Sequence, residues 1–406
     1  MEDFNTVIKN ELGAGANLSI INLVDHLVRH ACNIGASDIH IDPQEKGVRI
    51  RFRIDGVLED MNPLPKEIHE EIISRIKVLS GLRTDEHQAA QDGRFRNITS
   101  DSMSVDIRVS IVPTYHGENA VLRLLSDHEE NFTLETLGFT KTDQQKILHA
   151  IRKPSGMILV TGPTGSGKTT TLYTLIKMLN SKDISIVTIE DPIEYAVSNI
   201  EQIQVNPRTE LTFANGLRSI LRQDPNIIMV GEIRDVETAN IAVNTALTGH
   251  LLLSTLHTND VSTTLPRLLD MKIEPFLVAS TVSIAIGQRL VRKICEHCKD
   301  EKVINYEEHQ RLSETLPEGI MNGNVKFFYG RGCEQCNGSG YRGRIVINEV
   351  LVADEDIRSA ILRKVSANEI KQIAIKNGMT TMLVDGFQKS LLGLTTVEEV
   401  LRVTHE

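Results

Sequence analysis

The segment Gly162–Thr169 limits what this 406-residue chain can fold into more than any other feature of its sequence. It reads GPTGSGKT and satisfies the pattern G-x-x-x-x-G-K-[ST] at every fixed position. The apolar residues Met157–Val160 precede it and a helical pattern follows it, which is the strand–loop–helix setting of a phosphate-binding loop. The sequence therefore predicts an α/β domain that binds the phosphates of a nucleotide.

The residue types of this loop suit a bound triphosphate. Glycines let backbone N–H groups come close to phosphate oxygens, and the dipole of the following helix favours negative charge. We expect Lys168 to reach the β- and γ-phosphates and the Thr169 hydroxyl to bind Mg²⁺. The predicted nucleotide-binding residues are Gly162, Pro163, Thr164, Gly165, Ser166, Gly167, Lys168, Thr169 and Thr170.

Three more apolar strands are predicted in this part of the chain, at 185–189, 227–230 and 251–256. Short apolar strands that alternate with helical stretches are typical of a mainly parallel sheet covered on both faces. We therefore predict an α/β domain of the RecA-like P-loop kind. Ligands of such sheets lie beyond the carboxyl ends of the strands.

Polar residues follow the predicted strands at that edge of the sheet. Hydrolysis of a nucleotide requires a carboxylate that orients and deprotonates water near the γ-phosphate. Glu232 is our first candidate for this role, Glu194 is the second, and His257 ends the last of the three strands. For any single carboxylate, a surface charge or a helix cap is the competing interpretation. We expect Asp235 to cap a helix that begins at Val236.

The five cysteines fall into a single residue, Cys32, and two C-x-x-C pairs. In a reducing compartment such pairs indicate a metal site more often than a disulfide. Four thiolates suit a tetrahedral structural Zn²⁺, although buried free cysteines or a redox pair are alternatives. We expect Cys32 to pack in a core and His297 to be a spacer rather than a ligand. The predicted zinc ligands are Cys295, Cys298, Cys333 and Cys336.

The residues before Ser126 have a different pattern and predict a smaller α+β domain. Ser19 is placed to cap a helix whose apolar residues recur with the helical period. Val48–Ile54 alternates strictly, and Asp55-Gly56 after it is a hairpin turn signal. The predicted organisation is a flexible tail over 1–16, an α+β (PAS-like) domain over 17–127, a linker over 128–133, and a P-loop domain over 134–406 that includes a zinc-binding subdomain over 290–345. The tail from Glu349 onward is predicted to be helical and amphipathic.

Composition restricts the partners. The formal net charge is −10, tryptophan is absent and aromatic residues make up 4% of the chain. A negative chain repels a nucleic-acid backbone and offers few rings for stacking bases, so we expect no stable nucleic-acid partner. The N-terminus has no apolar signal segment, and the longest uncharged apolar stretch, Phe276–Gly287, is too short to span a bilayer. These features predict a cytoplasmic chain whose association with a membrane is indirect.

Together these motifs resemble those of the secretion ATPase superfamily, which powers type II secretion and type IV pilus assembly. Gly162–Thr169 resembles its Walker A motif and Glu190–Glu194 its aspartate box. Ile227–Asp235 resembles its atypical Walker B motif, with Glu where simpler P-loop enzymes place Asp, and Thr248–His257 its histidine box. The resemblance covers roughly residues 18–403, and it includes the segments Ser37–His40, Arg51–Gly56, Gln91–Arg94, Arg108–Ser110 and Gly393–Leu401.

The resemblance implies a homohexamer that uses ATP and Mg²⁺ and in which the first module docks on the motor domain and moves relative to it. Arginines of that module would then reach the phosphates. Arg94 and Arg108 match the family best and Arg123 less well, whereas we expect Arg49 and Arg51 to solvate a strand face. The implied partners are an inner-membrane platform protein and cytoplasmic assembly proteins of a pilus or secretion system. The chain would then be peripheral to the inner membrane.

The leading hypothesis is an ATPase motor that drives assembly of a type IV pilus or a type II secretion pseudopilus. The cysteine quartet favours assembly or export over a retraction motor, since retraction motors of the family lack such an insert. The regulatory domain that usually precedes the first module is missing, so the natural protein is short or this chain is a shortened form. A nucleic-acid translocase of the conjugation type, a pilus retraction motor and a non-hydrolysing nucleotide-dependent scaffold are the alternatives.

Overall fold

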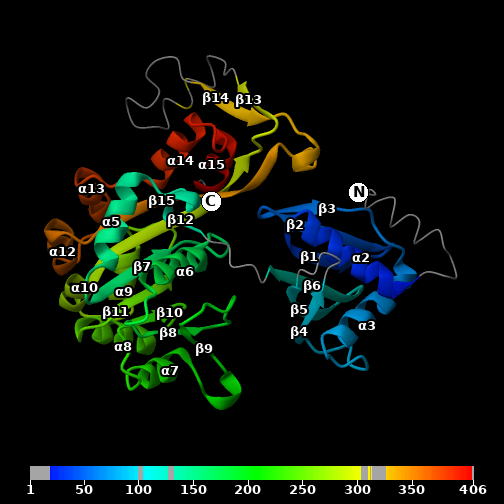
Figure 1. Ribbon diagram of the computed structural model, residues 1–406, viewed down its shortest axis with the longest axis horizontal. Coiled ribbons are helices and arrows are strands. Elements are labelled where there is room, and N and C mark those ends of the chain that lie inside the picture. Colours follow the sequence, from blue (N-terminus) through cyan, green and yellow to red (C-terminus); the bar gives the residue numbers. More distant parts are fainter. Residues whose placement is uncertain are drawn as a thin grey trace. The chain divides into compact units, whose positions relative to one another are not determined.

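The computed structural model describes residues 19–98, 104–126, 132–302, 310, 312 and 326–404 (Figure 1). The chain divides into two compact units, Met1–Glu129 and Glu130–Glu406. The predicted flexible tail, 1–16, and residues 128–131 of the predicted linker lie outside the described residues. Among the described helices, none combines the length and the apolar character needed to cross a membrane.

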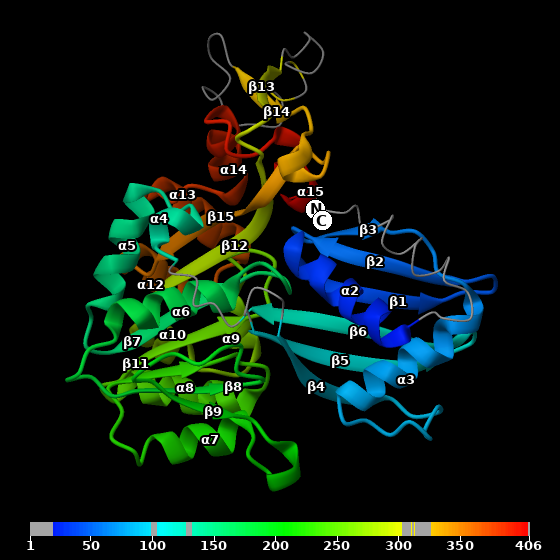
Figure 2. The ribbon, with the colours of Figure 1, turned by 45° about the vertical axis from the view of Figure 1, so that its right-hand side comes forward.

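In its described part, the first unit is a six-stranded antiparallel sheet with helices α2 and α3 packed on one face (Figure 2). The strand order is β3-β2-β1-β6-β5-β4. This is an α+β arrangement, and its likeness to a PAS domain stays a prediction. The elements are α2 (Ile20–Asn33), β1 (Ala36–Pro43), β2 (Val48–Ile54), β3 (Val57–Asp60), η2 (Lys66–Ile68), α3 (His69–Leu79), β4 (Gln91–Ile98), β5 (Ser104–Thr114) and β6 (Gly117–Ser126).

Local sequence explains the start of this unit. The Ser19 side chain caps α2 by accepting the backbone N–H of Asn22 at 3.3 Å, as predicted. Apolar residues at helical spacing along α2 are buried against the sheet. Strand β2 has the predicted bounds, and Asp55 and Gly56 have φ angles of 48° and 87°. Positive φ at both positions is what a two-residue hairpin turn requires.

The second unit is built on a seven-stranded sheet of order β15-β12-β7-β11-β10-β8-β9. All neighbouring strands are parallel except β12 and β15, which confirms the predicted mainly parallel sheet. The strands are β7 (Gly156–Thr161), β8 (Ile186–Glu190), β9 (Glu201–Gln204), β10 (Ile227–Val230), β11 (Leu251–Leu256), β12 (Val282–Ile294) and β15 (Tyr341–Val352).

Hydrophobic cores lie on both faces of this sheet. Met157 and Leu159 of β7 belong to one core, and Ile158 and Val160 belong to the other. This alternation follows from the two-residue period of a strand and explains why the whole strand is apolar. Helices α7 (Phe213–Ile220), α8 (Val236–Leu247), α9 (Thr264–Asp270), α10 (Pro275–Thr281), α12 (Glu355–Leu362) and α13 (Ala367–Lys376) contribute to the first core, and α4 (Leu134–Leu137), α5 (Lys141–Ile151) and α6 (Lys168–Leu179) to the second.

The sequence pattern missed the long antiparallel pair of β12 and β15. We expected the tail to be helical from Glu349 onward, but β15 continues to Val352 and the first helix after it starts at Glu355. The reason is that Ile345–Leu351 forms a continuous buried run inside the sheet, and such a run carries no period that separates strand from helix. The remaining elements are η3 (Pro207–Thr209), β13 (Lys299–Lys302), β14 (Phe327–Gly330), η4 (Glu334–Cys336), α14 (Met382–Leu391) and α15 (Val397–Thr404).

Glu399 ties the last helix to the sheet. Its carboxylate is 2% exposed and accepts hydrogen bonds from the backbone N–H and the guanidinium of Arg292 in β12, at 3.0 and 2.7 Å. Arg402 of the same helix donates two more, at 3.0 and 2.8 Å. Burial alone would raise the pKa of Glu399, but the hydrogen bonds from Arg402 and Arg292 outweigh it and lower the pKa to about 2.

This pKa predicts an acid-sensitive attachment of α15. Because the pKa of Glu399 is lower in the folded than in the unfolded chain, its contribution to stability is present above about pH 5 and is lost as the pH falls towards 2. We expect Glu399→Gln to lower the free energy of unfolding at pH 7 and to make almost no difference near pH 2. Urea unfolding followed by circular dichroism across this pH range tests it. A destabilisation that does not change with pH would contradict it.

Candidate functional site

The loop Gly162–Gly167 joins β7 to α6 at the carboxyl edge of the parallel sheet. Pro163, Thr164 and Gly165 are exposed, whereas Ser166 and Lys168 are buried and Thr169 and Thr170 are half-buried. Gly167 is the residue before the first turn of α6 and has a φ of 85°. The loop therefore opens to solvent directly over a helix N-terminus, where backbone N–H groups and the helix dipole favour an anion.

The Lys168 ammonium group is held by the loop itself. Its Nζ donates to the carbonyl oxygens of Gly162 at 2.8 Å and Pro163 at 2.9 Å. Burial lowers the pKa of Lys168, and the nearby carboxylate of Glu232 opposes that shift. The loop thus holds this amine with a carboxylate from the end of β10 close enough to affect its pKa.

Glu232 and His257 come together as the sequence predicted. Glu232 follows β10, is 9% exposed and lies 3.1 Å from His257, measured between Oε2 and the ring Nε2. Arg234 approaches the same oxygen, with its Nε at 2.6 Å. Arg234 is not among the site residues predicted from the sequence. Its spacing from Glu232 could have predicted its place in the site. Residues i and i+2 of an extended segment project to the same side, and Arg234 comes two residues after Glu232, just beyond a strand.

Glu194 belongs to a second group, at the end of β8. Glu190 ends that strand, is 2% exposed and accepts hydrogen bonds from Tyr173 and Thr188, both at 2.5 Å. Burial raises the pKa of Glu190, and the charge of Glu194 adds to this. Burial and Glu190 raise the pKa of Tyr173, and a backbone hydrogen bond of Glu194 lowers it while the charge of Glu194 raises it. These interactions place Glu194 with Glu190 and Tyr173, and its role in hydrolysis stays a prediction.

Asp235 caps α8, as predicted. Its side chain accepts the backbone N–H of Thr238 at 2.8 Å. A carboxylate used in this way satisfies an N–H group at the start of the helix and interacts favourably with the helix dipole. This leaves Glu232 as the described acidic residue between β10 and α8 that lies beside His257.

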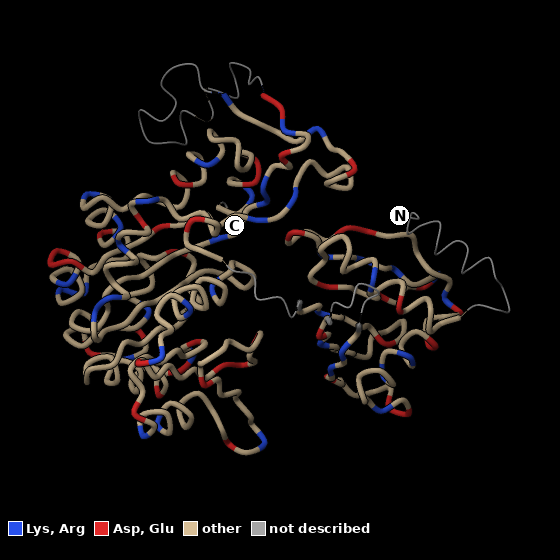
Figure 3. The backbone as a smooth tube through the Cα atoms, viewed as in Figure 1, with Lys and Arg blue, Asp and Glu red and all other residues tan. Residues whose placement is uncertain are grey.

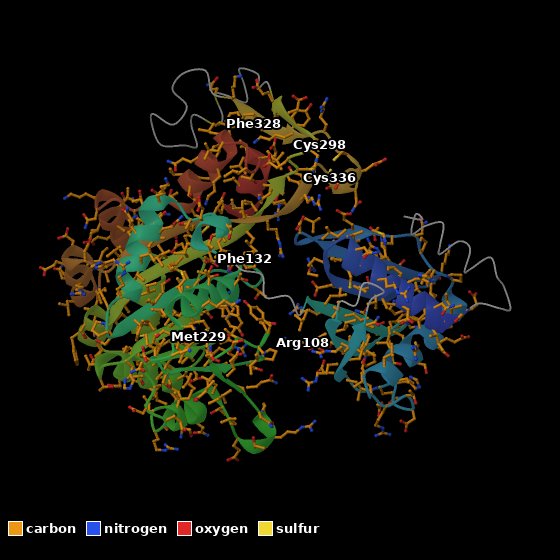
Figure 4. All side chains as sticks on the ribbon, in the orientation of Figure 1. Arg108, Phe132, Met229, Cys298, Phe328 and Cys336 are labelled. Atoms are coloured by element: carbon orange, nitrogen blue, oxygen red, sulfur yellow. The ribbon has the colours of Figure 1, made fainter. Side chains whose placement is uncertain are left out.

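The predicted arginines of the first unit form a row across three strands. Arg94 of β4 lies opposite Arg108 of β5, and Arg108 lies opposite Arg123 of β6. Alternation along the strands sends neighbours such as Phe95 and Ile107 into the core, so the row lies on the other face of the sheet. Arg123 pairs with Asp38 at 3.0 Å. Arg108, labelled in Figure 4, is the central member.

The four cysteines of the two C-x-x-C motifs come together beside the end of β12 and the start of β15. Cys298 and Cys336 are labelled in Figure 4. The four sulfur atoms all lie within 4.8 Å of one another. Cys295 and Cys333 are 3.8 Å apart, as are Cys298 and Cys336, and Cys333 and Cys336 are 3.7 Å apart. Four sulfurs around a tetrahedral ion at about 2.3 Å would be about 3.8 Å apart. The cluster therefore has the geometry to hold a metal ion.

The surroundings favour a thiolate at Cys336 but not at every sulfur of the cluster, since burial raises the pKa of Cys333 and raises that of Cys298 to about 12. Although burial raises it, backbone N–H groups of Cys333 and Gly340, both 3.2 Å from the sulfur, bring the pKa of Cys336 down to about 6. His297 is exposed, which fits its predicted role as a spacer. Cys32 packs against the core of the first unit, as expected.

Comparison with known proteins identifies relatives over nearly the whole chain. The family described as type II/IV secretion system protein matches residues 14–402. The type IV pilus assembly ATPase PilB of Thermus thermophilus is 47% identical over 383 residues, which cover 94% of this chain and 43% of that protein. The type II secretion system protein E of Xanthomonas campestris is 46% identical over 389 residues, which cover 95% of this chain and 68% of that protein. The chain thus spans less than half the length of the first relative.

Solved structures share the fold. The crystal structure of the pilus retraction motor PilT with bound ADP has a TM-score of 0.62 and 27% identity, covering 94% of this chain and 96% of that one. The X-ray structure of the Legionella pneumophila ATPase DotB has a TM-score of 0.67 at 24% identity, with coverages of 94% and 95%. The second likeness shows the fold alone.

The geometry predicts different tolerances for two glycines of the loop. Gly162 and Gly165 both have positive φ, 145° and 78°. A Cβ at Gly162 would also meet the carbonyl oxygen of Gln288 and the Ser166 hydroxyl, the latter at 2.7 Å, whereas a Cβ at Gly165 meets nothing within 4 Å. We expect Gly162→Ala to lower the free energy of unfolding by about 2–4 kcal/mol and Gly165→Ala by about 1 kcal/mol. Urea unfolding of the two variants tests this, and equal losses would contradict it.

Proposed function

The chain belongs to the family of type II/IV secretion system proteins, and from this premise we propose that it is an ATPase motor for fibre assembly. It hydrolyses ATP to ADP and phosphate and drives assembly of a type IV pilus or a type II secretion pseudopilus. The observation that carries the proposal is the meeting of Lys168 with Glu232 and His257 at the carboxyl ends of β7, β10 and β11. A phosphate-binding loop with a carboxylate beside it can bind a triphosphate and activate water.

Each residue of this edge has a separate task in the proposed reaction. The N–H groups of the loop bind phosphate oxygens, and Lys168 exchanges its two carbonyl partners for the β- and γ-phosphates. The Thr169 hydroxyl would hold Mg²⁺, which would neutralise phosphate charge. Glu232 accepts a proton from the attacking water, while Arg234 and His257 orient its carboxylate.

The arginine row completes the site in a homohexamer. We assign Arg94 and Arg108 the task of reaching the phosphates from the first unit, where added positive charge stabilises the transition state by about 10³–10⁵ in rate. Support comes from their position side by side on the face away from the core. An ordered row of guanidinium groups on a separate folding unit makes hydrolysis depend on that unit's movement, which is what a motor requires.

The cysteine cluster is proposed to bind one structural Zn²⁺ per chain. Support comes from the sulfur separations, which match those of a tetrahedral four-thiolate site. Four protein ligands leave no open coordination position. The ion would therefore stabilise the segments between β12 and β15 that carry the cysteines rather than take part in chemistry.

The relatives are named for both candidate fibres, at 47% and 46% identity, so either cargo fits the proposal. The proposed partners are an inner-membrane platform protein and cytoplasmic assembly proteins, which would keep the chain cytoplasmic and peripheral to the inner membrane.

A nucleic-acid translocase fits less well: the net charge is −10, and along the described parts of both units Lys and Arg are interspersed with Asp and Glu (Figure 3). Turnover that DNA stimulates at moderate salt would favour that alternative instead.

Replacing the proposed general base tests the enzymatic assignment. We expect Glu232→Gln to lower ATP turnover by about 10²–10⁴-fold while nucleotide affinity stays within about threefold, because the amide cannot accept the proton. Phosphate release and fluorescent-nucleotide titration measure the two effects. Glu237→Gln is a matched control, since Glu237 is an exposed residue in the first turn of α8 and pairs with Arg218 of α7. Turnover above background that is unchanged in Glu232→Gln would favour Glu194 as the base, whereas tight ATP binding with only background turnover in both chains would favour a non-hydrolysing scaffold.

Removing one sulfur tests the zinc assignment. Metal analysis of the purified chain should find about one Zn²⁺, and Cys333→Ser should lower both this content and the melting temperature, because metal binding is coupled to folding. Cys32→Ser, in the other unit, should leave the zinc content unchanged. A metal-free protein of undiminished stability would refute the assignment.

A further inference from the structure

Gln288 is a fully buried polar residue beside the phosphate loop. It is 0% exposed and lies on β12, the parallel neighbour of β7. In the register of the two strands Gly287 lies opposite Thr161, the residue that ends β7. Gln288 therefore reaches the sheet edge where the loop begins, although it is more than a hundred residues away in sequence.

The amide of Gln288 connects the loop to the helix that follows it. Its Nε2 donates to the carbonyl oxygen of Ser166 at 2.8 Å, and its Oε1 accepts from the Thr171 hydroxyl at 2.9 Å. Ser166 is 2% exposed and Thr171 is 0% exposed, so water cannot replace either bond without rearrangement. One side chain thus holds both ends of the turn from loop to α6.

Two glycines of the loop are packed against the same residue. A Cβ at Gly162 would collide with the Gln288 carbonyl oxygen, and a Cβ at Gly167 would lie 3.2 Å from the Gln288 Nε2. The close approach of β12 therefore accounts for part of the requirement for glycine in the motif. Gln288 therefore lies against the backbone of the loop at both glycines.

A bond to the Ser166 carbonyl has a defined effect on the anion site. The peptide between Ser166 and Gly167 is planar and trans, so its C=O and N–H point in opposite directions. Holding the carbonyl towards Gln288 aims the Gly167 N–H away from β12. The buried Ser166 hydroxyl has no hydrogen-bond partner among the described residues, so this carbonyl bond is the contact that orients the peptide.

We propose that Gln288 is a positioning residue for the nucleotide: it orients the Ser166–Gly167 peptide so that the loop N–H groups are aimed at the phosphates before nucleotide arrives. The inference rests on the proposed nucleotide function of the loop. Gln288 acts through the loop backbone and needs no contact with the reacting atoms. Its loss weakens binding in the ground state and the transition state alike, which raises KM and leaves kcat nearly unchanged.

The test uses Gln288→Met, which keeps the length of the side chain and removes both hydrogen bonds, in the full chain. The dissociation constant for fluorescent ADP and the KM for ATP should both rise about tenfold, with kcat within about twofold of the unsubstituted chain. Gln288→Glu keeps the acceptor for Thr171 but places an oxygen against the Ser166 carbonyl. This variant should bind ADP at least as weakly as Gln288→Met. Melting temperatures measured in parallel report any general loss of packing.

Threonines of α6 supply matched controls. Thr171→Val removes the hydroxyl that bonds Gln288 and should weaken ADP binding, while Thr171→Ser keeps a hydroxyl and should restore it. Thr174 lies one turn later, is 3% exposed and donates to the Thr170 carbonyl oxygen of its own helix at 2.8 Å. Thr174→Val should therefore leave the dissociation constant unchanged even where it lowers the melting temperature.

The outcomes separate this inference from the function on which it rests. If the unsubstituted chain binds and hydrolyses nucleotide and Gln288→Met binds ADP with unchanged affinity, the positioning role alone is overturned. Equal loss of affinity in Gln288→Met and Thr174→Val would also overturn it, since the effect would then be one of packing. An unsubstituted chain that neither binds nor hydrolyses nucleotide would overturn the proposed function and this inference with it.

Discussion

The parallel pairing of β7, β11 and β10 is the interaction on which the chemistry of the second unit depends. The register sets Leu256 opposite Thr161 and Val230 opposite Ser254, so the three strands end at one edge. Whatever follows each strand is then brought to the same place: the phosphate loop after β7, Glu232 after β10 and His257 after β11. An antiparallel pairing would have sent one of these groups to the far edge of the sheet.

The antiparallel pair of β12 and β15 extends the sheet on the other side of β7, next to the loop. Gln288 on β12 bonds the loop backbone, and opposite Gly287 the buried carboxylate of Glu349 on β15 accepts the backbone N–H of Val261 at 2.7 Å. Burial raises the pKa of Glu349. The same pair of strands ends at the cysteine cluster and so connects the proposed metal site to the proposed nucleotide site.

Sequence reasoning worked best where the signal is short-range. The Ser19 cap, the alternation of β2 and the Asp55-Gly56 turn depend on neighbours a few residues apart, and all three are present in the structure. It was wrong about the start of the helical tail, because the buried run Ile345–Leu351 has no period. It also gave no role to Gln288 or Arg234, since a buried amide and a strand-end arginine look ordinary until their partners are known.

The sequence by itself determined the loop Gly162–Thr169, the strand-end candidates Glu232 and His257, and the two cysteine pairs, because each is a local pattern with its own chemical meaning. The sequence also predicted that the two cysteine pairs form one site and that Glu232 and His257 share a sheet edge. Only the tertiary structure decided the contacts between distant groups that carry no such pattern: it set Arg94, Arg108 and Arg123 in a row and placed Gln288 against the Ser166 carbonyl. The physical reason is that strand order and register arise from the packing of whole faces, and that long-range information is not carried by the spacing of residues along the chain.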